Sequence, residues 1–227
     1  RELASFSVWI WATASVKVVW DRCDAFVLGP VFGSAGLGKY MLSHEIALLP
    51  LTEFVAPASE ALFAAFSRAQ KDGQSSVHYA GDAAGIVQFA VVPMVITISA
   101  AAGPIIEVLL GQKWSDAWPI VAVLTWACVF SPFSYVFSMV AIANGYVRAN
   151  FIGSVIVSAL KLATLIVATA FTSDMVVIAS ATAACIALES ATFVLVLRGK
   201  DGLRLRPILA AATRLCLATA MALGAVY

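Results

Sequence analysis

Three glutamates recur at helical spacing in the run HEIALLPLTEFVAPASE. Glu45, Glu53 and Glu60 lie within about 80° of one another on an α-helix that turns about 100° per residue. Thr52 and Ser67 fall on the same side of this helix. Carboxylates in such a row accept hydrogen bonds from hydroxyl groups or bind cations. The spacing therefore predicts a helix with one acidic face.

The composition of the chain makes this acidic face unusual. Hydrophobic residues make up 62% of the chain and charged residues 12%, and the mean hydropathy is +0.94. A soluble domain carries about 25% charged residues, so this composition predicts a membrane protein. A net charge of +1 gives no basic field for a nucleic acid.

A charge near the centre of a bilayer costs at least about 2.5 kcal/mol, so Glu53 requires a water-filled cavity or a cationic partner. In the alternative interpretation, Glu45 and Glu60 lie near the two interfaces and are simply hydrated. Glu53 alone is then anomalous.

Long uncharged runs set the elements that must carry these residues. Residues 83–106 and 117–147 hold no charge, and roughly 20 apolar residues suffice for a helix to cross a bilayer. The sequence predicts an all-α, polytopic membrane helix bundle of about seven transmembrane helices. The expected helices cover residues 3–19, 40–66, 83–110, 117–143, 149–172, 175–197 and 207–227.

The stretch GSAGLGKY, residues 33–40, fits seven places of a phosphate-binding loop. Tyr40 stands where that loop needs the hydroxyl of a serine or threonine to hold magnesium. The distribution of basic residues predicts that the first helix leaves the cytoplasm, which puts this stretch on the outer side, away from cytoplasmic ATP. We interpret it as a glycine-rich connection that lets the chain turn.

Prolines interrupt several of the expected helices, at Pro50, Pro57, Pro93, Pro104 and Pro132. Each proline removes a backbone hydrogen bond, so the helices should bend there. Broken helices are common where transporters bind substrate, although kinks also occur in plain bundles.

Charged residues elsewhere suggest one further pair. Lys161 and Glu189 fall at similar depths on consecutive antiparallel helices, which predicts an intramembrane ion pair with either a structural or a transport role. Lys17 and Arg214 lie near the ends of predicted spans and are expected to extend to the interface.

No pattern typical of a catalytic site, a metal site or a cofactor site is present. His44 and His78 lack the partners of a metal motif. The four cysteines are far apart, and we interpret them as small hydrophobic residues. The sequence therefore does not indicate an enzyme.

The run DRCDAFVLGPVFGSAGLGKYMLSHEIALLPLTEFVAPASEALFAAFSRAQKD, with the later GQKWSDAWPI, resembles polysaccharide flippases. These belong to the multidrug/oligosaccharidyl-lipid/polysaccharide exporter superfamily. The resemblance implies a multi-pass protein of the bacterial inner membrane that moves polyprenyl-pyrophosphate-linked oligosaccharide by alternating access. Residues 1–200 would form the C-terminal six-helix lobe, and residues 201–227 would begin the extra helices. The chain starts at Arg1 and is expected to lack the N-terminal lobe.

On that plan, Asp24 joins Glu45, Thr52, Glu53 and Glu60 in a hydrophilic cavity that binds the sugar or a coupling ion. Many relatives carry arginine where this chain has Glu45, so the pyrophosphate must be bound elsewhere, or Glu45 pairs with a cation of the N-terminal lobe. Expected partners are the lipid-linked oligosaccharide, the bilayer and that lobe. Polysaccharide polymerase and glycosyltransferases are further candidates.

Two alternatives remain open at this point. One is a drug or cation exporter of the same superfamily, which shares every helix-level feature. The other is an integral-membrane glycosyl or prenyl transferase, which would need paired aspartates for magnesium at a membrane face, and the sequence shows no such pair.

Overall fold

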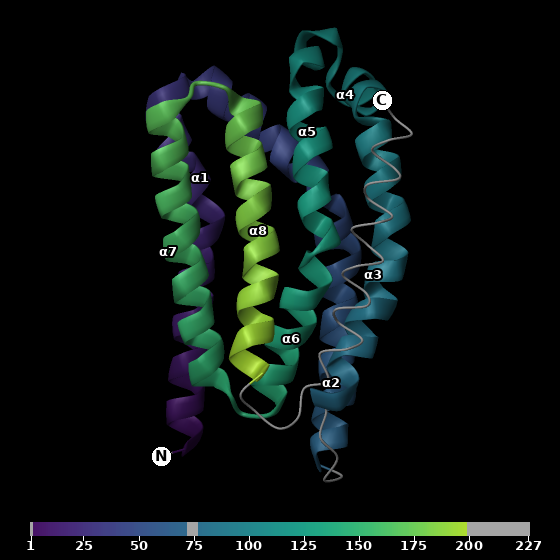
Figure 1. Cartoon of the computed structure of the whole chain (residues 1–227), viewed down its shortest axis with the longest axis vertical. Coiled ribbons are helices and arrows are strands. Elements are labelled where there is room, and N and C mark those ends of the chain that lie inside the picture. The colour runs from purple at the N-terminus through teal and green to yellow at the C-terminus, as the bar shows by residue number, and fades with distance from the viewer. Residues whose placement is uncertain (1, 72–76, 199–227) are drawn as a thin grey trace.

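The computed structural model describes residues 2–71 and 77–198, and within them it is an all-α bundle without strands. The predicted all-α fold class is confirmed. The helices run up and down side by side, so most turns lie at the two ends of the bundle (Figure 1). The predicted helix 207–227 and the boundary at residue 201 lie outside the described residues.

The first helix is much longer than predicted. Instead of ending near Val19, α1 (Glu2–Ala47) continues to a kink at Gly33 and then runs on. Gly33 has φ 67° and ψ −177°, and glycine adopts this positive φ without the clash that a Cβ would cause. We call residues 2–32 the first arm of α1 and residues 34–47 its second arm. The turn expected in GSAGLGKY is thus confined to Gly33, and the preceding stretch FVLGPVF is helical.

The two arms of α1 pack closely to other helices beside this kink. A Cβ added at Gly36 would come within 2.7 Å of the Phe32 side chain and 2.8 Å of the Met175 side chain. The absence of a side chain at Gly36 therefore lets the second arm approach the start of α8.

The second arm leads into a helical run interrupted by a wide turn. A π-helix, η1 (Leu51–Val55), precedes α2 (Ala56–Lys71). Pro50 caps η1, and the N–H of Ala56 donates to the carbonyl of Leu51, five residues earlier. Because prolines stand at 50 and 57, two of the usual helical donors are missing here. The predicted interruption is confirmed.

The middle of the chain forms two further interrupted runs. The first consists of α3 (Val77–Ala100) and α4 (Ala102–Leu110), which are separated at Ala101. Pro93 lies within the continuous helix α3, and Pro104 lies just after the break. A short 3-10 helix, η2 (Gln112–Ala117), then leads into the second run.

That second run is α5 (Trp118–Thr125), the 3-10 helix η3 (Trp126–Val129) and α6 (Ser131–Ala143). It bends by 41° at the break before α6. Pro132 lies in the first turn of α6, next to the break, as the sequence predicts.

Two antiparallel helices, α7 (Val147–Phe171) and α8 (Met175–Arg198), complete the described bundle. Their limits match the predicted helices 149–172 and 175–197 to within two residues. The first arm of α1 packs along α7, which packs along α8.

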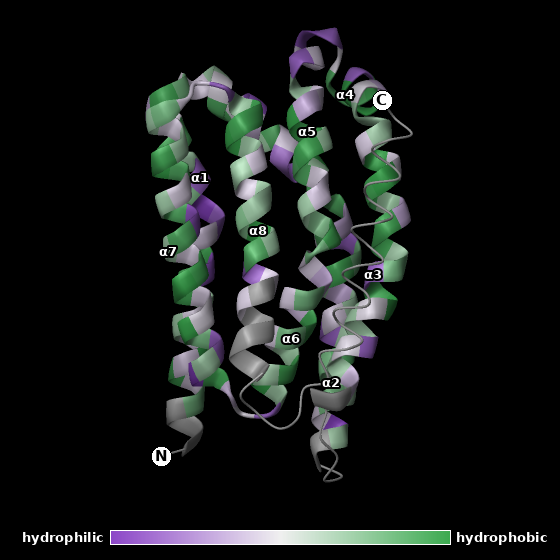
Figure 2. Ribbon diagram, in the orientation of Figure 1, coloured by the Kyte–Doolittle hydropathy of each residue, from purple (hydrophilic) through white to green (hydrophobic). Residues whose placement is uncertain are grey.

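Large apolar side chains are exposed on the outer surface of the bundle, as expected for a protein in a bilayer. Phe89, Val108 and Phe171 are at least 85% exposed, and hydrophobic residues follow the helices along their length (Figure 2). Among the described helices, 3 are long and apolar enough to span a membrane, and the bent α5–α6 run would make 4. The figure of about seven transmembrane helices stays a prediction.

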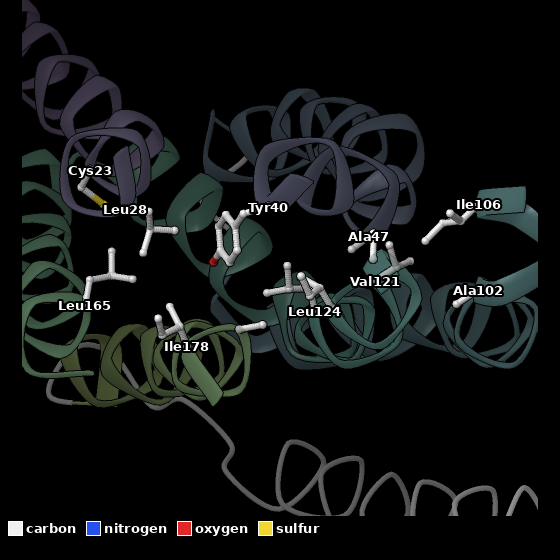
Figure 3. Close-up of a cluster of buried hydrophobic side chains, with 13 residues drawn as sticks. Cys23, Leu28, Tyr40, Ala47, Ala102, Ile106, Val121, Leu124, Leu165 and Ile178 are labelled. Atoms are coloured by element: carbon white, nitrogen blue, oxygen red, sulfur yellow. The ribbon is translucent and has the colours of Figure 1, made fainter. Parts of the chain in front are cut away.

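A single cluster of apolar side chains holds α1, α4, α5, α7 and α8 together (Figure 3). Leu28 and Tyr40, one from each arm of α1, are buried in it. They meet Leu124 of α5, Leu165 of α7 and Ile178 of α8, which are all at most 1% exposed. This cluster fixes both arms of α1 and therefore positions the charged residues that they carry.

Candidate functional site

The three glutamates of the predicted acidic face lie along the helical run from the second arm of α1 to α2. Glu45 is on the second arm, Glu53 is inside the π-helix η1, and Glu60 is on α2. All three glutamates are exposed on the described chain. None forms an ion pair in the part of the chain that the structure describes. These carboxylates are thus available to a ligand or to another surface.

The π-helix η1 also changes the backbone hydrogen bonding around Glu53. Pro57 has no N–H, so it cannot donate to the carbonyl four residues earlier, which is that of Glu53. π-helical turns inside α-helices occur frequently at functional sites. The exposed Glu53 carboxylate therefore lies where the regular α-helical bonding is interrupted.

Thr52 contributes less to this face than its spacing suggests. Its hydroxyl is exposed but is directed to its own helix, 3.3 Å from the Leu48 carbonyl and 3.4 Å from the Leu49 carbonyl. The hydroxyl hydrogen is donated to these backbone carbonyls, so Thr52 can only accept a hydrogen bond from a ligand.

Asp24 does not share the exposed acidic face, because it is buried between α1 and α7. It is 1% exposed, and its Oδ2 lies 2.6 Å from the Lys161 Nζ. The Lys161 ammonium also donates to the Trp20 carbonyl at 3.2 Å and lies 4.4 Å from the centre of the Trp20 ring. We expected Asp24 to line an open cavity with the glutamates, but it is buried and paired with Lys161 instead.

The predicted partner of Lys161 is also corrected. Lys161 does form a buried intramembrane ion pair, but its carboxylate partner is Asp24 and not Glu189. The reason is geometric: α7 packs along the first arm of α1 as well as along α8, and the sequence-based pairing considered only consecutive helices. Asp24 lies between the expected helices 3–19 and 40–66, so that pairing does not include it.

One oxygen of the buried pair has no donor. Among the described residues, Asp24 Oδ1 is a fully buried side-chain atom without a hydrogen-bond partner. Nearby, the Tyr40 hydroxyl lies 3.2 Å from the Thr182 Oγ1, and Tyr40 stacks on His44 with ring centres 6.2 Å apart. The interior between α1, α7 and α8 thus holds two separate polar contacts, Asp24 with Lys161 and Tyr40 with Thr182.

Glu189 occupies a different environment from the one predicted. It is half-buried on α8, and it forms no ion pair with Lys161 or any other residue in the described part of the chain. Lys17 is exposed near the middle of the first arm and not at its end, and its expected extension to a membrane interface stays a prediction. Its Nζ is 3.3 Å from the Tyr135 hydroxyl of α6 and 5.0 Å from the centre of that ring.

Several polar residues at the break in the α5–α6 run were not recognised from the sequence. The Phe133 N–H donates to the Phe130 carbonyl, three residues earlier, and so leaves the Val129 carbonyl without its usual donor. Gln88 of α3, 2% exposed, supplies this donor at 2.9 Å. Ser190 of α8 donates to the Phe130 carbonyl at 2.7 Å. The signals available in the sequence are Pro132 and Gln88, a polar residue within the uncharged run 83–106.

The other residues considered as candidates form a surface ion pair or are buried in the bundle. Lys39, the lysine of GSAGLGKY, lies 3.3 Å from Asp116 of η2 at the exposed end of the bundle. The described cysteines Cys23, Cys128 and Cys185 are buried and free. Among the described residues, no group of three or more His, Cys, Asp or Glu is placed to hold a metal ion.

Comparison with known proteins gives one result for this chain. No curated protein and no solved structure matches it. The model of a family described as polysaccharide biosynthesis protein matches residues 1–119, which include both arms of α1, the π-helix, α2, α3 and α4. This is more than half of the chain. The chain is therefore a member of this polysaccharide biosynthesis protein family.

Proposed function

We propose that the protein is a flippase that moves polyprenyl-pyrophosphate-linked oligosaccharide repeat units across the bacterial inner membrane by alternating access. Family membership supports a role in polysaccharide biosynthesis or export. The observation that carries the finer proposal is the exposed row of acidic residues on a helix with a wide turn at Glu53. In an apolar bundle such a row needs a hydrophilic cavity, and sugar hydroxyls are suitable donors to it.

In this proposal the protein is a transporter and not an enzyme. Glu45, Glu53 and Glu60 accept hydrogen bonds from the sugar, while the N-terminal lobe of the same protein closes the cavity from the other side. The interrupted α3–α4 and α5–α6 runs supply joints that let the helices rock. The lipid-linked oligosaccharide is the substrate, and the polymerase and glycosyltransferases of the same polysaccharide are its working partners.

Replacing Glu53 tests this role. Glu53→Gln keeps the shape of the side chain but removes its charge, and a hydrogen bond to a charged group is worth about 1.5–3 kcal/mol. We expect a roughly ten- to hundredfold loss of surface polysaccharide in cells that depend on the full-length protein. The measurement is polymer on the cell surface, normalised to the amount of inserted protein.

Glu107→Gln is the matched control, because Glu107 is also exposed but lies on α4, away from the acidic face. This variant should export normally. If Glu53→Gln and Glu107→Gln both give wild-type amounts of polymer, the acidic face plays no part in transport.

A further inference from the structure

An exposed arginine lies against an aromatic pair where the first arm of α1 meets α7. The guanidinium carbon of Arg148, near the start of α7, lies 5.8 Å from the centre of the Trp9 ring of the first arm. Trp9 also contacts Phe151 of α7, with ring centres 5.2 Å apart and planes inclined by 55°. These contacts join the two helices and restrict the direction of the arginine side chain.

The charge of Arg148 has no counter-ion in the part of the chain that the structure describes. Arg148 is exposed, and neither of the ion pairs found there includes it. A guanidinium that lies over a ring directs its N–H groups away from that ring, and its planar fork matches two oxygens of one phosphate group. Arg148 is therefore suited to bind an anionic group from outside the described chain.

The face of α7 that begins at Arg148 is otherwise apolar. At about 100° per residue, positions 152, 155, 159, 162 and 166 fall within about 40° of position 148. All five residues are exposed: Ile152, Val155, Ala159, Leu162 and Ile166. The opposite side of α7 is buried against the bundle, with Lys161 and Leu165 among its residues. One exposed face of α7 thus carries a cation at its start and hydrocarbon along the rest of its length.

This order of charge and apolar surface matches a phospholipid that lies along the helix. α7 is long and apolar enough to span a membrane, and tryptophan is enriched where spanning helices meet the headgroup region. A phosphate at Arg148 places the acyl chains over Ile152 and Val155, which lie about 6 Å and 11 Å further along the helix. An anionic headgroup fits better than a zwitterionic one, because the latter carries its own cation.

We propose that Arg148, Trp9 and the apolar face of α7 form a binding site for an anionic phospholipid. The guanidinium binds the phosphate, and the acyl chains pack along α7. In the predicted orientation this end of α7 faces the cytoplasm, where anionic lipids attract basic residues near the membrane surface. The site lies apart from the three glutamates, and lipid binding requires no oligosaccharide substrate.

Titration of phosphatidylglycerol into the purified full-length protein in detergent tests this site, with the bound lipid counted by native mass spectrometry. Arg148→Gln should weaken binding of the tightest phosphatidylglycerol at least about tenfold, because a charge-assisted hydrogen bond is lost. Arg148→Lys keeps the charge but not the planar fork, so its affinity should fall between the two. Trp9→Leu removes the contact beneath the guanidinium and should weaken binding about two- to fivefold.

Lys113→Gln is the matched control, because Lys113 is exposed on η2, at the opposite end of the bundle from the start of α7 (Figure 1). This variant should bind phosphatidylglycerol as the wild type does. Inorganic phosphate should not displace the lipid, because it has no acyl chains to pack on the apolar face. Displacement by inorganic phosphate, equal losses in Arg148→Gln and Lys113→Gln, or equal binding of phosphatidylglycerol and phosphatidylcholine to the wild type would overturn the proposal.

Discussion

Lys161→Met should destabilise the protein by about 3–5 kcal/mol, because it leaves the Asp24 carboxylate buried without its cation. Asp24 and Lys161 side chains are each 2% exposed, so water cannot take over the role of the missing partner. Asp24 Oδ1 already lacks a donor, which makes the site more dependent on Lys161. The measurement is the thermal unfolding of the purified full-length protein in detergent.

A double substitution identifies the partner of Lys161. Lys161→Met combined with Asp24→Leu removes both charges and should recover most of the lost stability, since replacing both members of a buried pair is often nearly neutral. Lys161→Met combined with Glu189→Leu should show no such recovery. Recovery of stability with Glu189→Leu but not with Asp24→Leu would contradict the Asp24 pairing and support the pairing of Lys161 with Glu189 that the sequence suggests.

The exposed pair Lys39–Asp116 provides the matched control for this experiment. Its side chains are 28% and 79% exposed, and Nζ lies 3.3 Å from Oδ2. An exposed ion pair contributes about 0–1 kcal/mol, so Lys39→Met should unfold close to the wild-type temperature. Equal effects of Lys39→Met and Lys161→Met would contradict the account of the buried pair.

Gln88→Leu should lower the stability by about 1–3 kcal/mol, because the Val129 carbonyl is then left unpaired in an apolar interior. Gln88 is the donor at 2.9 Å, and Val129 is 0% exposed. The lost hydrogen bond lies at the 41° bend. The two parts of the α5–α6 run should therefore also move more freely relative to each other. Hydrogen exchange of the amides near the bend measures this local effect alongside thermal unfolding.

Thr97→Val is the control for Gln88→Leu. Thr97 is exposed on the same helix, α3, and its hydroxyl bonds only to the Pro93 carbonyl of its own helix. Unfolding and exchange should be close to wild type in this variant. Faster exchange throughout the bundle in Gln88→Leu, rather than near the bend, would show that Gln88 does not act on the break.

The helical bundle could be predicted because the bilayer imposes simple rules on length and composition. The long apolar stretches predicted α7 and α8 to within two residues, and the prolines predicted the breaks at η1 and before α6. The course of α1 could not be predicted in the same way. The charged residues after Val19 favour an end of the first helix there, but Asp24 is paired with Lys161, which follows far later in the chain, and the helix continues.

The candidate site was predictable only as far as it depends on one helix. Helical periodicity found Glu45, Glu53 and Glu60, and all three are exposed. It could not find the partner of Lys161, because that depends on which helices pack together and at what rotation. The capping of the Val129 carbonyl by Gln88 likewise requires α3 and the α5–α6 run to be placed relative to each other.

Direct translocation of substrate tests the central claim. The purified full-length protein is placed in liposomes that carry a fluorescent polyprenyl-pyrophosphate-linked oligosaccharide in both leaflets, and a membrane-impermeant quencher is added from outside. We predict that nearly all the fluorescence becomes quenchable with wild-type protein, whereas about half remains protected with Glu53→Gln, since lipids divide between two leaflets. Protection of half the fluorescence with both proteins, at equal reconstitution, would contradict the account.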